Sequence, residues 1–273
     1  MKRYVDNIGF AFLVATGVLA VAFLVFPLLV SVSMSFDSRG YLGPFPPPSL
    51  SLRWYESFFS DSYYLNGLKN SLILATIAAV VSTTVGVTAA VVIDRYEFKG
   101  KQALATLFLS PLIVPAVVFG FALLMFFSLL GIFEGFPRMI GGHIIITIPY
   151  TVRTTLAGLV GIRKTLTEAA MSLGANERQA FWDVTLPLAK TGIVTGAIFA
   201  FAFSMDDVAV SLFLSDPNTY TLPVAMISMM RAKFDMTISA AAVLLVMVTL
   251  ALLVVLDRTI GLDKLLGQGV YRA

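Results

Sequence analysis

The sequence of 273 residues contains no cysteine. It therefore holds no disulfide, no thiol nucleophile and no cysteine metal site. Histidine occurs once, at His143, without a cluster of metal-ligand residues beside it in the sequence, so we expect a polar interface residue rather than a metal ligand. The sequence also has no convincing Ser/His/Asp pattern and no G-x-x-x-x-G-K-[ST] phosphate loop. We expect neither catalysis nor a bound cofactor in this chain.

Charge is also scarce. Only 13% of the residues are charged, whereas 58% are hydrophobic, and the mean hydropathy is +0.88. A soluble domain of this composition would expose more apolar surface than it could bury. The sequence therefore predicts an integral membrane protein. The formal net charge of +3 is modest, so nucleic-acid binding is not expected.

The hydrophobic residues gather in segments long enough to cross a bilayer as helices. The first segment is longer than the apolar core of a signal peptide and has no small-x-small cleavage site, so we expect it to be retained. An even number of spans places both termini on one side. The fold class expected is an all-α membrane protein, one permease-like domain over residues 1–273, with six spans at about 8–34, 68–93, 103–130, 142–162, 191–214 and 238–256.

The distribution of lysine and arginine predicts the orientation. With both termini in the cytoplasm, twelve of the 19 basic residues lie inside, six lie outside, and Arg153 lies within a span. Positive charge is enriched on the cytoplasmic side of membrane proteins, so this orientation is favoured. The cytoplasmic set is Lys2, Arg3, Arg95, Lys99, Lys101, Arg163, Lys164, Arg178, Lys190, Arg258, Lys264 and Arg272.

A polar insert at residues 163–190 separates the fourth and fifth spans. Thr165 with Glu168 has the spacing of a capping box, and Gly174 is placed to end the short helix in the left-handed conformation. Asn176 with Gln179 repeats the capping pattern before a second short helix. We expect Pro187 to stop that helix.

Within this insert, the run Glu168-Ala-Ala-Met-Ser-Leu-Gly174 is followed after nine residues by Val184-Thr-Leu-Pro187. The spacing resembles the EAA signature, E-A-A-x-x-x-G-x(9)-I-x-L-P, of the membrane subunits of binding-protein-dependent ABC importers, and only Val184 departs from it. The segments around Trp54-Tyr55-Glu56, Asn70-Ser71-Leu72 and Ser204-Met-Asp-Asp-Val208 are also similar to this family. The resemblance extends from about Leu52 to Gly261.

The resemblance implies the six-helix permease fold of type I importers, in the bacterial cytoplasmic membrane. It also implies a second, non-identical permease, two ATPase subunits that bind ATP and Mg, and an extracytoplasmic substrate-binding protein. The insert would be the cytoplasmic element that couples the ATPase to the permease. Its coupling residues would be Glu168, Ala169, Ala170, Gly174, Leu186 and Pro187.

Several spans contain residues that disturb or tighten helices. Pro111 and Pro115 interrupt the third span, and Pro149 lies in the fourth. Gly192 and Gly196 give the fifth a face of small residues for close helix packing.

Asp206 and Asp207 lie within the fifth span, about 24 Å beyond Lys190 if the helix is continuous at 1.5 Å per residue. Carboxylates at that depth need a water-filled cavity or a cationic partner. Two roles remain open. They attract a cationic substrate, or one caps a broken half-helix while the other pairs with a nearby base. The predicted substrate pathway comprises Asp206, Asp207, Arg153, Tyr150 and Ser204.

The sequence indicates the substrate class less directly than it indicates the family. The block at residues 204–208, with Leu222-Pro223 downstream, resembles most the spermidine/putrescine permeases and their opine, phosphonate and thiamine relatives. Arg153 departs from what that resemblance implies, because an apolar residue is expected there in a polyamine permease. It either neutralises Asp206 or Asp207, or binds an acidic group of a zwitterionic substrate. With two acids against one base, a polyamine such as putrescine or spermidine is favoured.

Two other classes are weaker. An ion-coupled secondary transporter would use Asp206 and Asp207 as coupling sites but leaves the capped insert unexplained. A membrane-embedded enzyme lacks a catalytic set of residues. On the opposite side of the membrane, the proline-rich stretch 40–48 and an amphipathic helix near 52–59 form either a platform for a delivering protein or a connector.

Overall fold

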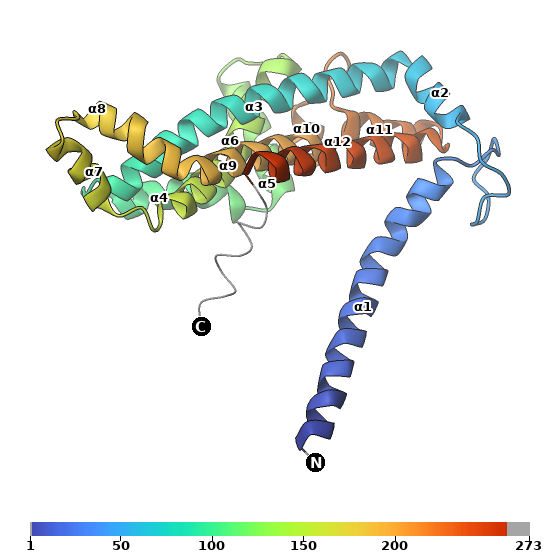
Figure 1. Ribbon diagram of the computed structural model, residues 1–273. Helices are drawn as coiled ribbons and strands as arrows, with labels where there is room; N and C mark the ends of the chain where they lie inside the picture. Colours follow the sequence, from blue (N-terminus) through green and yellow to red (C-terminus); the bar gives the residue numbers. More distant parts are fainter. Residues whose placement is uncertain (1, 261–273) are drawn as a thin grey trace. The chain divides into compact units, whose positions relative to one another are not determined.

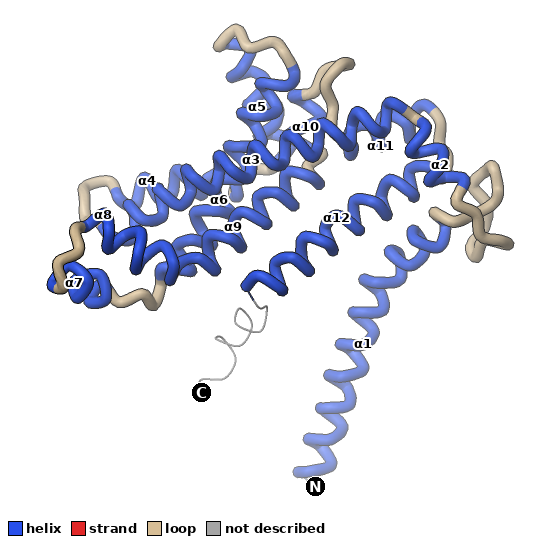
Figure 2. Tube along the Cα trace, turned by 45° about the horizontal axis from the view of Figure 1, so that its top comes forward, coloured by secondary structure: helices blue, strands red, loops and turns tan. Residues whose placement is uncertain are grey.

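The computed structural model describes residues 2–260 and, within them, the side chains of residues 9–163, 165–252, 254, 255 and 258. Over that range the chain is built of helices joined by loops, with two isolated β-bridges and no strand (Figure 2). The predicted all-α class is confirmed. The helices form two units, residues 2–64 with 226–246 and residues 65–225 with 247–260. Lys264 and Arg272, counted above toward the cytoplasmic charge, lie outside the described residues.

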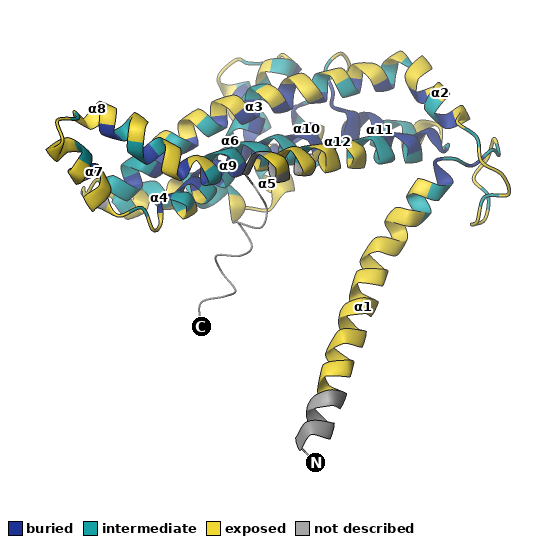
Figure 3. Ribbon diagram, viewed as in Figure 1, coloured by how far each residue is buried: buried dark blue, intermediate teal, exposed yellow. Residues whose placement is uncertain are grey.

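The first unit contains α1 (Lys2–Met34), α2 (Arg53–Ser60), the end of α11 (Leu222–Ala232) and the start of α12 (Thr237–Ile260). Residues 9–29 of α1 are all exposed (Figure 3), although this helix is strongly apolar. Such a surface requires lipid or another membrane subunit around it. Only its end is packed, where Met34 joins Trp54, Met236 and Ala240 in a small core.

The loop between α1 and α2 is held by a buried ion pair. Arg39 donates from Nε and Nη2 to the carboxylate of Asp37, which is fully buried, and from Nη2 to the carbonyl of Pro44. Trp54 Nε1 donates to the carbonyl of Asp37 at 2.6 Å. The hydrogen bonds from Arg39 hold the pKa of Asp37 below its ordinary value. The stretch therefore has a defined shape rather than a merely extended one.

The second unit contains most of the helices. Figure 1 shows α3, α6 and α9 running side by side, with α7 and α8 at one end. One core joins α3, α5, α6 and α10 through Leu74, Phe127, Met139 and Leu214, among others. The helices are α3 (Ser62–Arg95), α4 (Lys101–Leu109), η1 (Ser110–Leu112), α5 (Ala116–Leu129), α6 (Gly135–Leu159), α7 (Lys164–Ser172), α8 (Glu177–Ala180), the π-helix η2 (Phe181–Thr185), α9 (Leu186–Asp206) and α10 (Ala209–Leu214).

The predicted small-residue face of the fifth span is where α6 and α9 meet. A Cβ placed on Gly158 of α6 would lie 3.0 Å from Gly192 Cα, and one on Gly196 would lie 3.0 Å from Thr151 Cα. No side chain fits between backbones at this distance. The two helices therefore pack through glycine, as expected from the sequence.

The six predicted spans are only partly recognisable as single helices. By length and apolar composition, three described helices can cross a membrane: Gly9–Met34, Ser62–Arg95 and Glu177–Asp206. A fourth is obtained if Lys101–Leu112 and Ala116–Leu129 are taken together. Polar residues such as Arg138, His143 and Arg153 make α6 less apolar, and the apolar part of α12 that is described ends at Leu252. The count of six stays a prediction.

Two of the predicted spans are broken: the third, where the interruption by proline was predicted, and the fifth, whose continuity the sequence left open. The segment 103–130 bends by 107° between Leu112 and Ala116, at the positions that Pro111 and Pro115 disturb. The segment 191–214 stops at Asp206 and resumes as α10 at Ala209. Pro149, in contrast, lies inside α6 without ending it.

Candidate coupling and transport sites

The coupling insert folds as two short helices, but its first cap differs from the prediction. The helix α7 begins at Lys164, its N-cap is Arg163, and no side chain caps it. Thr165 lies inside the first turn, so the Thr165–Glu168 capping box is wrong. The second prediction is confirmed. Asn176 accepts from the N–H of Gln179, and the Gln179 side chain accepts from the N–H of Asn176.

Gly174 ends α7 as expected. Its φ is +99°, in the left-handed region. The N–H of Gly174 donates to the carbonyl of Met171, and the N–H of Ala175 donates to the carbonyl of Ala170. These two bonds form a Schellman motif, which satisfies two carbonyls at the helix end and turns the chain sharply. The angle between α7 and α8 therefore depends on a glycine at this position.

The prediction that Pro187 stops the second short helix is wrong. The chain passes from α8 through the π-helix η2 into α9, and Pro187 lies in the first turn of α9. A proline in a continuous α-helix lacks an N–H and clashes with the carbonyl four residues earlier. Here the turn just before Pro187 is a π turn rather than a regular α turn. Leu186 and Pro187 are thus the first two residues of α9, within the continuous helical segment Glu177–Asp206.

The helix α7 presents most of its surface to solvent. Among its described side chains only Thr167 is buried, whereas Glu168 and Ala169 are exposed and Ala170 is half-buried. Leu173, which follows the helix, is 90% exposed. Glu168 forms no ion pair within the described part of the chain. An exposed acid beside exposed apolar side chains is a surface suited to a partner protein.

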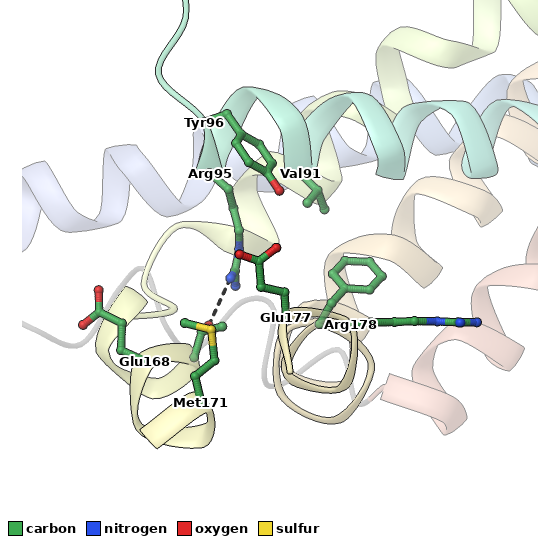
Figure 4. Close-up of a pocket in the computed structure, with 9 residues that line it drawn as sticks. Val91, Arg95, Tyr96, Glu168, Met171, Glu177 and Arg178 are labelled. Carbon is green, nitrogen blue, oxygen red and sulfur yellow. Dashed lines mark hydrogen bonds between the residues drawn. The ribbon is translucent and has the colours of Figure 1, made fainter. Parts of the chain in front are cut away.

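A cavity of about 480 Å³ lies between the end of α3, the helix α7 and the region of α8 and η2. Figure 4 shows Arg95 reaching from α3 toward α7, with Glu168 turned away from it. Arg95 Nη1 donates to Thr167 Oγ1 at 3.0 Å, and Nη2 donates to Thr185 Oγ1. Neither the cavity nor these bonds were predicted from the sequence. The basic residue in the last turn of a long helix was the available signal.

The break after α9 is organised by Asp207. Its Oδ2 accepts from the N–H of Ser211 at 2.8 Å and from Ser211 Oγ at 3.1 Å, and its Oδ1 accepts from the N–H of Val210 at 3.5 Å. The first turn of α10 has free N–H groups that need such an acceptor. Asp207 therefore has the capping role that the sequence left open.

His143 is at the centre of this polar cluster, not at an interface as expected. It is fully buried. Its Nδ1 lies 2.8 Å from Ser204 Oγ, and its Nε2 lies 2.9 Å from Ser211 Oγ. Because Ser211 gives its one proton to Asp207, the network assigns the imidazole proton to Nε2, and Ser204 donates to Nδ1. Ser204, Asp207 and Ser211 have helical spacing, which was the signal that sequence reasoning missed.

A second cavity, of about 190 Å³, opens at the same break. Asp207 lines it together with Tyr150 of α6 and Phe203 of α9, whose ring centroids are 4.7 Å apart. Leu112 and Ala116, at the bend of the third predicted span, also line this cavity. The two interrupted segments therefore meet around one carboxylate and two aromatic rings.

The other predicted pathway residues are placed differently. Ser204 is buried, and its hydroxyl is bonded to His143, so it does not line this cavity. Asp206 and Arg153 are exposed. Arg153 forms no ion pair with either aspartate: among described residues the one basic side chain within 4.0 Å of the Asp207 carboxylate is that of His143, with Nε2 at 3.9 Å. The predicted neutralisation by Arg153 is therefore wrong for this structure.

The turn predicted at Asp216 is present and fastens the end of α6. Asp216 Oδ1 accepts from the N–H groups of Asn218 and Thr219, and Oδ2 accepts from the N–H of Gly135 at 2.7 Å. Burial raises the pKa of Asp216, but these N–H groups and Arg138 outweigh it, and the net pKa is lowered. The carboxylate thus links the start of α6 to the turn that follows α10 by hydrogen bonds.

Known proteins resemble the chain over most of its length. The spermidine/putrescine transport system permease protein PotC of Shigella flexneri is 31% identical over 91% of this chain and 93% of its own. The putrescine transport system permease protein PotI of Escherichia coli is 31% identical over 83% of each chain. A solved bacterial ABC transporter that imports the acidic polysaccharide alginate contains a chain with the same fold, with a TM-score of 0.74, 18% identity and coverage of 93% and 94%.

The family described as binding-protein-dependent transport system inner membrane component matches residues 82–261. That match includes the coupling insert, the α6–α9 contact and the break at Asp207. The chain therefore belongs to this family, the inner-membrane permease subunits of ABC importers.

Proposed function

We propose that this permease subunit carries a polyamine-like organic cation, such as putrescine or spermidine, across the cytoplasmic membrane. It forms half of the route, and a second, non-identical permease forms the other half. Two ATPase subunits bind ATP and Mg and supply the energy, and an extracytoplasmic binding protein delivers the substrate. This chain contributes no catalytic residue. Membership of the family argues against an ion-coupled secondary transporter.

The cavity at the helix break carries this proposal. A carboxylate attracts an ammonium group, and aromatic faces such as those of Tyr150 and Phe203 stabilise cations at short range. Oδ1 of Asp207 has only one long hydrogen bond, so it can still accept from a substrate. The exposed Asp206 adds a second negative charge nearby, and Arg153 is not positioned to cancel either. The names of the relatives agree with a cationic substrate.

A second substrate class is supported by Arg153 itself. Its side chain is exposed on α6 and forms no ion pair within the described part. It lies three positions from Tyr150, hence at a neighbouring place on the helix surface. A free guanidinium binds carboxylates and phosphonates in a bidentate manner. An opine-, phosphonate- or other zwitterionic solute would use Arg153 and Asp207 together.

Coupling to ATP is assigned to the exposed surface of α7. Closure of the ATPase dimer around ATP would move α7 as a rigid element, with Glu168 and Leu173 in contact with the ATPase and Gly174 fixing the angle to α8. The ATP state drives the transporter only if it binds one permease conformation better than the other. The small number of buried side chains in α7 supports this role, because the helix can shift without disrupting a large core.

The test uses the intact complex in proteoliposomes with its binding protein. Putrescine and spermidine are expected to stimulate ATP hydrolysis and to be taken up, and orthovanadate should block uptake. Asp207→Asn should lower polyamine uptake at least tenfold while the complex still assembles, because the amide keeps an acceptor for α10 but loses the charge. Arg153→Met should leave uptake within about twofold.

The matched comparison separates the two substrate classes. If zwitterionic amino-acid conjugates alone stimulate the ATPase, and Arg153→Met abolishes that response, the polyamine proposal is wrong and the second class holds. Asp206→Asn is the control for charge alone, since Asp206 is exposed and its carboxylate forms no ion pair in the described structure. A loss equal to that of Asp207→Asn would assign the effect to net charge rather than to the cavity.

A further inference from the structure

One side chain, that of Arg95, forms hydrogen bonds to α7 and to the residue that precedes α9. Arg95 is the last residue of α3, which is a membrane-length helix. Its guanidinium donates to Thr167 Oγ1 in α7 through Nη1 and to Thr185 Oγ1 at the end of η2 through Nη2. Thr185 directly precedes α9. One planar group therefore joins a membrane helix, the coupling helix and the start of the next membrane helix.

The side chains of both threonines that accept from Arg95 are buried. Thr167 is 7% exposed and is the only buried side chain described in α7, and Thr185 is 1% exposed. The Nε atom of Arg95 is itself buried and has no partner. Apart from the chain connections at its two ends, α7 thus has Thr167 as its one buried attachment.

The helix α7 also packs against α8 and η2, but toward α3 it faces a cavity. The space between α3, α7 and α8 is a cavity of about 480 Å³ lined by Arg95, Tyr96, Met171 and Phe181, among others. A cavity has no partner atoms to transmit a displacement by contact. Hydrogen bonds across its edge therefore provide the direct link between α7 and α3.

The chemistry of arginine suits this position. Its nitrogens form a rigid planar fork, so two acceptors bound to Nη1 and Nη2 are held at a fixed separation. A lysine ammonium is a single point on a flexible stem and does not fix two hydroxyls in one geometry. The uncharged threonines leave the guanidinium charge available to the carbonyls at the end of α3.

We infer that Arg95 is a positioning residue that makes α3 and the start of α9 follow the coupling helix, so that movement of α7 reaches the membrane helices. This inference rests on the proposed role of α7. It predicts that α3 and α7 move together in the working transporter. Without Arg95, α7 would still meet the ATPase, but its movement would not be passed to α3.

The first measurement is a distance between α3 and α7 in the assembled complex. Spin labels at Thr88→Cys and Ser172→Cys, both exposed sites in this cysteine-free chain, report it by pulsed electron resonance. With the native Arg95, the distance is expected to be narrow and equal in the nucleotide-free and ATP–vanadate states. In Arg95→Met and in Thr167→Val it should broaden and depend on nucleotide. An unchanged, narrow distance in both variants overturns the inference, as does a nucleotide-dependent distance with the native Arg95.

The second measurement is the amount of substrate taken up per ATP hydrolysed. Arg95→Met, Thr167→Val and Thr185→Val should lower this ratio at least fivefold while ATP hydrolysis continues, and Arg95→Lys should fall between them and the wild type. Lys99→Met removes an exposed positive charge on the nearby loop and is expected to keep the wild-type ratio. If Arg95→Met does not assemble, the two near-isosteric threonine variants decide the outcome, and wild-type ratios in both refute the inference.

These results are separable from failure of the proposed function. A wild-type complex whose ATPase is not stimulated by loaded binding protein contradicts the proposed transport role. The spin-label distance still decides in that case, because it reports the α3–α7 attachment without requiring a known substrate.

Discussion

Oδ2 of Asp207 lies 3.9 Å from Nε2 of His143, with Ser211 Oγ bonded to both groups. The contact joins α6 to the point where the following membrane segment breaks. A buried carboxylate and a buried imidazole satisfy each other through a serine at this point, and the half-helix α10 starts from the same carboxylate. The break is therefore held by a specific set of polar bonds.

The first prediction is that His143 stabilises this cluster. His143→Ala removes the partner of Ser204 and one of the partners of Ser211, in a fully buried site. Leaving buried polar groups unsatisfied costs about 1–3 kcal/mol each. We expect a lower melting temperature of the detergent-solubilised complex and weaker uptake. His143→Asn, which can replace one bond, should lose less. Equal stability of His143→Ala and the wild type would show that the cluster does not hold the break.

Gly174 determines the turn between α7 and α8 through its backbone conformation. With φ at +99°, a β-branched side chain is strained there, by about 1–2 kcal/mol or more. Gly174→Val is expected to abolish uptake and substrate-stimulated ATP hydrolysis together, although subunit assembly is retained. Gly174→Asn should be much milder, since asparagine tolerates this conformation. A value of uptake for Gly174→Val close to that of Gly174→Asn would argue against a role for the turn angle.

The contact between α6 and α9 has no space for added atoms. Gly192→Val would drive a side chain into the backbone of α6 near Gly158, and overpacking of this kind costs about 1–3 kcal/mol. We expect little correctly assembled protein by size-exclusion chromatography. Ala157→Val, which adds the same kind of side chain on an exposed position of α6, is the matched control and should assemble normally.

The loop after α1 gives a pH prediction. The pKa of Asp37 is below its ordinary value because of Arg39, so the ion pair stabilises the loop fully above the unfolded value of 3.8 and is lost as the pH falls below it. The chain has two tryptophans, so Trp182→Phe leaves Trp54, bonded to the carbonyl of Asp37, as the only reporter in the chain. Its emission should be constant from pH 5 to 8. In Asp37→Asn the emission should already be shifted to longer wavelength at pH 7, and an unshifted spectrum there contradicts the clamp.

Orientation is tested by labelling single cysteines with a membrane-impermeant reagent. Ser49 and Asn218 should label from outside in intact cells, whereas Gln102 and Asn176 should label only after permeabilisation. All four positions are exposed in the structure, so a negative result reports the side of the membrane rather than burial. The reverse pattern would place α7 outside and remove it from any ATPase.

The sequence was informative where a physical signal is local. The left-handed glycine at position 174, the capping box at Asn176, the small-residue face at Gly192 and the bend near Pro111 all follow from properties of single residues or short spacings. Each was predicted correctly from these residues alone.

Long-range contacts were not accessible in the same way. Nothing in the spacing of His143 and Ser204 indicates that they meet, since they are 61 residues apart. The bond between Arg95 and Thr185 spans 90 residues. Pro187 was misread because a proline that ends one helix and one that opens the next turn look alike in sequence. The π turn that distinguishes them depends on how the whole insert packs.

The sparse attachment of α7 bears on how such importers can be recombined. Side chains on its exposed surface do not pack against the rest of the subunit. Thr167, by its hydrogen bond, and Gly174, by its backbone conformation, hold the helix in place. The surface that we propose contacts the ATPase is therefore separable from the residues that hold the helix in place. A coupling helix from a related permease, grafted with these two positions kept, should bring its own ATPase preference to this subunit without altering what the membrane helices carry.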